Sequence, residues 1–118
     1  WGYETWLANN EKEDYCGKIL HINAGCSSSM HYHMDKHETF YVREGQLQVI
    51  LIDTEQGRES HHSIVTFFTI VHSMVLENCT FEIERGQPHQ LIAYGGNDVE
   101  FIEISTFHKD SDSKRIHR

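Results

Sequence analysis

Ten histidines in 118 residues give this chain an unusual number of side chains that can bind metal. His31 and His33 are separated by one residue, so on a strand both imidazoles face the same side, about 7 Å apart along the backbone. Glu38 follows after a short polar turn, where its carboxylate can face the same point. Imidazole nitrogen and carboxylate oxygen suit divalent iron, manganese, zinc, nickel or cobalt. The spacing therefore predicts a site for one divalent metal ion per chain.

Two further ionisable residues fall on rows that should face inward. Lys18 alternates with Leu20 and Ile22, and Glu103 alternates with Phe101. A charged side chain on such a face is unusual unless it reaches a charge partner or the mouth of a pocket. We therefore expect Lys18 either to extend to the rim or to act by its charge beside the metal, and Glu103 is a candidate base.

The remaining histidines lack ligand spacing, and we expect them on outer faces, in loops or in the tail. His37 adjoins Glu38 and should point to the opposite side of its strand. The others are His21, His61, His62, His72, His108 and His117. We assign none of them a part in the site.

The elements that must position these residues are short strands. Valine and isoleucine number 17 whereas leucine and alanine number 9, a bias that favours strands over helices. The expected strands are Lys18–Ala24, Met30–His33, Glu38–Arg43, Gln46–Asp53, Ser63–Val71, Met74–Leu76, Thr80–Ile83, His89–Ala93 and Val99–Phe107. Many short strands separated by turns are typical of a sandwich or a barrel. At this length we expect an all-β chain folded as one small jelly-roll barrel.

A single domain should account for residues 1–118. Residues 1–14 are mixed and polar and predict an N-terminal arm, and residues 108–118 predict a polar tail that is either mobile or docked on the surface. The net charge of −8 argues against nucleic acid and anionic membrane as partners. No stretch approaches 18 apolar residues, and no signal peptide is visible. Three cysteines without a CxxC spacing indicate no disulfide framework, so we expect a cytoplasmic protein.

The metal-ligand stretch resembles a known family. Its spacing matches the first motif of the cupin superfamily at every position: Gly25-x5-His31-x-His33-x4-Glu38-x6-Gly45. The full spacing is far more specific than the His-x-His pair alone, because each added position lowers the chance expectation. The resemblance implies a single cupin-type jelly-roll barrel.

A later stretch resembles the second cupin motif through Gly86-x2-His89. Asn78 and Glu84 stand where the family usually has glycine and proline, and Ala93 replaces a late asparagine. These departures concern turn geometry more than ligation. The resemblance implies that His89 is the third histidine ligand.

A narrower resemblance extends outside the two motifs. The stretches Trp1–Glu4, Tyr15–Leu20, Glu103–Ser105 and Asp112–Ile116 are similar to the cupin domain of bacterial type II phosphomannose isomerases and related sugar-phosphate cupins. That family usually has glutamine where this chain has His31. The departure makes the ligand set more like that of other cupins with three histidines and a glutamate.

This resemblance, together with the inward rows, implies a metal-dependent isomerase or epimerase that acts on a sugar or sugar phosphate. The metal would stabilise negative charge on the substrate, Glu103 would move a proton between carbons, and Lys18 would neutralise charge or hold a phosphate. Two alternatives stay open: an iron-dependent cupin dioxygenase, and a non-catalytic cupin that binds a carbohydrate or another small ligand.

The apolar residues outside the core predict self-association. Tyr3, Trp6 and the β-branched run Ser63–Val71 would expose a surface that promotes aggregation if it were left uncovered. A homodimer is the simplest arrangement that covers it.

Overall fold

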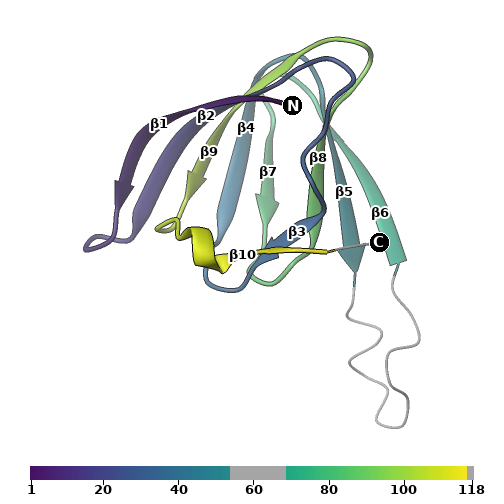
Figure 1. The fold of residues 1–118 in the computed structure, drawn as a ribbon. Helices are drawn as coiled ribbons and strands as arrows, with labels where there is room; N and C mark the ends of the chain where they lie inside the picture. Colours follow the sequence, from purple (N-terminus) through teal and green to yellow (C-terminus); the bar gives the residue numbers. More distant parts are fainter. Residues whose placement is uncertain (54–68, 117–118) are drawn as a thin grey trace, which may run out of the picture.

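The computed structural model describes residues 1–53 and 69–116. They form two antiparallel five-stranded sheets that face each other (Figure 1). In order across the first sheet lie β1 (Gly2–Asn10), β2 (Tyr15–Ile22), β9 (Val99–Ser105), β4 (Glu38–Glu44) and β7 (Thr80–Ile83). Across the second lie β10 (Ser113–Arg115), β3 (His31–His33), β8 (His89–Ala93), β5 (Leu47–Asp53) and β6 (Thr69–Val75). The expected all-β jelly-roll barrel is confirmed.

The core lies between the sheets and is apolar at one end only. In four strands, the inward-facing residues form a row that changes from polar to apolar toward the same end of the barrel. Written from the polar member, they are Lys18, Leu20 and Ile22 in β2; Glu38, Phe40 and Val42 in β4; His89, Leu91 and Ala93 in β8; and Glu103, Phe101 and Val99 in β9. In the first sheet, Lys18 pairs with Glu103, and Glu103 pairs with Phe40. Glu38 pairs with Ser105, so the row of β4 is offset by one inward position from those of β2 and β9. Strand alternation thus builds a polar end above an apolar floor.

The turns that join these strands use residues that tolerate a positive φ. Gly45 has a φ of 85°, and a Cβ there would lie 2.3 Å from the backbone oxygen of Asp98, so only glycine fits. Asn78 has a φ of 65° at the position where the cupin motif usually has glycine. Asparagine is one of the few other residues that adopt this conformation, so the departure keeps the turn.

The C-terminal segment is docked, which decides between the two alternatives for residues 108–116. It contains the short 3₁₀ helix η1 (Asp110–Asp112) and then β10, which pairs with β3. The buried carboxylate of Asp112 accepts backbone hydrogen bonds from Met34 (2.9 Å), Asp35 (3.1 Å) and Lys36 (3.2 Å). The polar composition of this segment therefore reflects hydrogen bonding to the distant residues 34–36 and not mobility.

Several expected boundaries differ from the structure. Residues 1–14 are not simply an arm, because Gly2–Asn10 is the edge strand β1; its exposed side chains gave no apolar alternation. β2 ends at Ile22, so Ala24 is exposed and not inward. A single strand, β6, replaces the end of Ser63–Val71 and the separate Met74–Leu76.

Residues 54–68, with His61 and His62, and residues 117–118, with His117, lie outside the described residues. Within the described ranges, no helix has the length and hydrophobicity that a bilayer span requires.

Candidate metal centre

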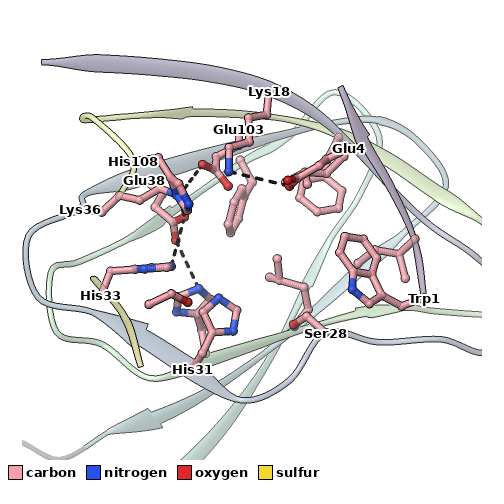
Figure 2. Close-up of a pocket in the computed structure, with 17 residues that line it drawn as sticks. Trp1, Glu4, Lys18, Ser28, His31, His33, Lys36, Glu38, Glu103 and His108 are labelled. Carbon is pink, nitrogen blue, oxygen red and sulfur yellow. Dashed lines mark hydrogen bonds and ion pairs between the residues drawn. The ribbon is translucent and has the colours of Figure 1, made fainter. Parts of the chain in front are cut away.

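A cavity of about 140 Å³ opens at the polar end of the barrel (Figure 2). Its apolar floor consists of Leu20, Ile22, Phe40, Leu91 and Phe101. The ionisable side chains that line it are Glu4, Lys18, His31, His33, Lys36, Glu38, His89, Glu103 and His108. The cavity therefore combines an apolar floor with a dense group of charges, as is common in binding and catalytic sites.

Three imidazoles converge on one side of the cavity. His31 and His33 are in β3, and His31 pairs in register with His89 at the start of β8. Each residue offers a ring nitrogen, and these nitrogens lie within 4.8 Å of one another. His31 Nδ1 donates to the oxygen of Ser29 (2.8 Å), and His89 Nδ1 donates to the oxygen of Gln87 (2.9 Å). Because a carbonyl only accepts, Nε2 of both rings carries the free lone pair.

Glu38 completes the set from the first position of β4. Its Oε2 lies 3.3 Å from His89 Nε2, and its Oε1 lies 3.8 Å from His33 Nε2. Within residues 1–53 and 69–116, the buried atoms Glu38 Oε2, His89 Nε2 and His33 Nδ1 have no hydrogen-bond partner. Buried polar atoms without a partner are rare in folded proteins, and Glu38 Oε2 and His89 Nε2 lie 3.3 Å apart, so this pair fits two ligands of one cation. The three nitrogens and one carboxylate suit a divalent transition metal.

The electrostatics of the site favour neutral His31 and His33 and an ionised Glu38. Burial lowers the pKa of His31, and it lowers the pKa of His33 to about 4. Burial also raises the pKa of Glu38, but His89 and Lys36 outweigh it and hold that pKa well below its usual range. Neutral imidazole and ionised carboxylate are the forms that bind a metal ion.

Lys36, in the turn between His33 and Glu38, is a site residue that the sequence did not reveal. Its buried Nζ lies 2.7 Å from Glu103 Oε2 and 3.2 Å from Glu38 Oε1. It also donates to His108 Nδ1 at 2.9 Å. Burial lowers the pKa of Lys36, but the two carboxylates outweigh it and raise that pKa. One ammonium thus joins Glu38 to Glu103 (Figure 2).

Lys18 and Glu103 face the cavity, as their strand positions predicted. Both are at least 96% buried, with exposed fractions of 3% and 4%. Burial and the charge of Glu38 raise the pKa of Glu103. Ser105 approaches the same oxygen of Glu103 that Lys36 does. Glu103 is therefore a buried carboxyl group whose proton affinity is higher than usual.

Two further histidines, His37 and His108, lie on opposite sides of the strands around the cavity. His37 points away from the cavity, as expected, and its Nε2 lies 3.0 Å from Glu82 on the outer face. His108 was wrongly assigned no part in the site, because it lines the cavity and caps Lys36. Its position depends on the docked C-terminal segment, and local spacing carries no signal of that docking.

Sequence comparison assigns the family. A family model described as Cupin matches residues 7–115, and the chain belongs to the cupin family. No curated protein matches it significantly.

Solved structures share the fold at low sequence identity. CapF, a capsular polysaccharide assembling protein from Staphylococcus aureus, has 16% identity and a TM-score of 0.72 over 99% of this chain and 32% of its own. A mutant of Bacillus subtilis oxalate decarboxylase has 18% identity and a TM-score of 0.74 over 98% of this chain and 28% of its own. An uncharacterised Klebsiella pneumoniae protein with a double-stranded β-helix domain has 11% identity and a TM-score of 0.71 over 99% of this chain and 85% of its own. This chain thus spans about a third of the length of the first two, and the likeness concerns the fold.

Proposed function

We propose that this cupin holds one divalent metal ion through His31, His33, Glu38 and His89. The observation that carries the proposal is the convergence of one ring nitrogen each from His31, His33 and His89 to within 4.8 Å of one another, beside the buried carboxylate of Glu38. Oxalate decarboxylase, which shares the fold, has Mn(II) centres, and this supports a divalent cation.

We propose further that the site isomerises or epimerises a small sugar or sugar phosphate. A divalent ion would supply Lewis-acid stabilisation of negative charge that develops on a substrate oxygen. Glu103 moves the proton between adjacent carbons, since Lys36 and Ser105 both engage Oε2 and leave Oε1 to take it. Lys36 keeps Glu103 in place, and the apolar floor excludes water from the reacting carbons.

Metal content tests the ligand assignment. Glu38→Ala or His89→Ala should lower the metal bound per chain sharply, while circular dichroism stays that of a folded β-protein because the apolar core lies below the site. His37→Ala is the matched control, since His37 faces outward. A double variant, His31→Ala with His33→Ala, that keeps close to one metal ion per chain would refute the assignment.

Solvent deuterium tests the reaction. Metal-loaded protein should incorporate deuterium at the carbon next to the carbonyl of at least one member of a panel of aldoses and aldose phosphates. Glu103→Gln should reduce the rate by about 10²- to 10⁴-fold with unchanged metal content. If no substrate exchanges, oxygen uptake with ferrous iron would favour a dioxygenase, and saturable sugar binding without turnover would favour a binding protein.

A homodimer is proposed from the outer face of the first sheet. Tyr3 of β1 is about half exposed on this face, as are Leu7 and Ile104, and Leu7 lies against Gly17, the strand partner of Ile104. Trp6 is also about half exposed, but it lies on the cavity side beside Lys18 and does not contribute to this face. Such exposed apolar side chains favour a protein contact. Ile104→Lys should convert a dimer to a monomer in sedimentation at micromolar concentration; a monomeric parent protein would exclude the proposal.

The cysteines bear on the compartment. Cys16, Cys26 and Cys79 are all free thiols. Reducing compartments preserve thiols, so we propose the cytosol as the location.

A further inference from the structure

Lys18 is a largely buried cation whose Nζ makes no hydrogen bond to the part of the chain that the structure describes. Its side chain is 4% exposed, and Lys18 lines the cavity from β2. Within the described ranges, Nζ has only a loose ion pair with Glu4 Oε2 at 3.8 Å and a position 3.9 Å above the ring of Trp6. Neither is a hydrogen bond, whereas a buried ammonium normally donates several. Lys18 thus presents free donors at the cavity.

The charge around the cavity favours an anion once a metal ion is bound. Lys18 and Lys36 face three carboxylates, those of Glu4, Glu38 and Glu103, so the ionised side chains carry a net charge of −1. A divalent cation would change this to +1. Lys36 already has three partners, so Lys18 is the cation with capacity to bind a ligand.

The volume of the cavity limits the size of the ligand. A cavity of about 140 Å³ holds roughly six to ten non-hydrogen atoms, since an engineered cavity of similar volume in another protein holds benzene. A larger molecule would have to extend through the mouth. The part of the ligand that is enclosed is therefore about the size of a three-carbon compound.

We infer that Lys18 binds the anionic oxygen group of a small substrate, a carboxylate or a phosphate, opposite the metal ligands. The inference deepens the proposed function by naming the substrate class as small and negatively charged, and it rests on that proposal for the metal. Glu4 competes for Lys18, because its carboxylate lies 3.8 Å from Nζ and carries the same charge as the ligand. Binding of the ligand displaces Glu4 from this contact.

Three probes of matched carbon number test the inference by isothermal titration calorimetry on zinc-loaded protein. They are glycerol, which is neutral, glycerate, which has a carboxylate, and glycerol 3-phosphate. At least one anion should bind about 10- to 100-fold more tightly than glycerol, the range expected for a charge-assisted hydrogen bond away from water. The preferred anion identifies the group as carboxylate or phosphate.

Variants separate recognition from folding. Lys18→Met should abolish the preference for the anion, Lys18→Arg should retain it, and Lys114→Met, an exposed control in β10, should change nothing. Glu4→Gln should strengthen anion binding, because it removes the competing carboxylate. If Lys18 were only a structural partner of Glu4, Glu4→Gln would not strengthen binding.

The outcomes distinguish this inference from the proposed function. Equal affinity for glycerol and both anions, or an anion preference that survives in folded Lys18→Met, would overturn the inference. The same titrations on chelator-treated protein show whether the anion preference requires the metal. A preference that depends on Lys18 but not on zinc would support anion binding and contradict a metal-dependent function.

Discussion

The sequence predicted the candidate ligands His31, His33 and Glu38, but it did not predict Lys36. His31, His33 and Glu38 lie close together in the chain, so strand alternation alone brings them to one side. Lys36 sits in the same turn, but nothing local distinguishes it from a solvated turn lysine. Its burial depends on Glu103 and His108, which come from distant parts of the sequence. Residues whose environment is made by long-range packing leave no local pattern.

Replacing Lys36 by methionine should destabilise the metal-free protein by about 3–5 kcal/mol, because it leaves Glu38 and Glu103 buried without their shared cation. Urea unfolding measures this change. Metal addition should raise the stability of Lys36→Met more than that of the parent protein, since a cation at Glu38 replaces the lost charge. Lys114→Met, in exposed β10, should have an effect within about 0.5 kcal/mol. Equal stabilisation by metal in both proteins would contradict this role.

At the scale of elements, alternation predicted the strands with one buried face and missed those without one. β2, β4, β8 and β9 each alternate between buried and partly exposed residues. β1 is exposed along most of its length, so it has no apolar period. The three-residue strand β10 is exposed too, and pairing with β3 defines it. An edge strand of this kind forms because it pairs with a neighbouring strand, and the sequence of the segment alone does not show that pairing.

Asp112 couples the C-terminal segment to the metal-ligand turn. Asp112→Ala removes the acceptor of three backbone N–H groups, at Met34, Asp35 and Lys36, between two proposed ligands. The free energy of unfolding should fall by about 1–3 kcal/mol, and metal affinity should fall with it. Chelator competition measures the affinity, and hydrogen exchange reports the three amides.

Two further variants control this prediction. Ser111→Ala, in the exposed middle of the same short helix, should leave both measurements unchanged. Asp112→Asn keeps one acceptor oxygen and should give an intermediate effect. Unchanged metal affinity and persistent amide protection in Asp112→Ala would mean that the turn is rigid without the clamp.

For the whole molecule, the buried histidines make stability depend on pH. Burial lowers the pKa of His33 from an ordinary 6.5 to about 4, and it also lowers those of His31 and His108. Between pH 6.5 and 4, the unfolded chain therefore binds more protons than the folded chain, and stability falls as the pH falls. The raised pKa of Glu103 acts in the opposite direction, because its protonation favours the folded state. The three histidines lower the stability on acidification, whereas this one carboxyl group raises it.

The melting temperature of chelator-treated protein should therefore decrease steadily from about pH 6.5 to about pH 4, as followed by circular dichroism. Excess zinc should raise the melting temperature at pH 7, and this gain should shrink over the same range because protons compete for the imidazoles. His33→Gln should flatten the decrease in the metal-free protein, since glutamine does not titrate. A melting temperature that is constant or rises on acidification would show that Glu103 outweighs the histidines, and the electrostatic account of the barrel's polar end would then be wrong.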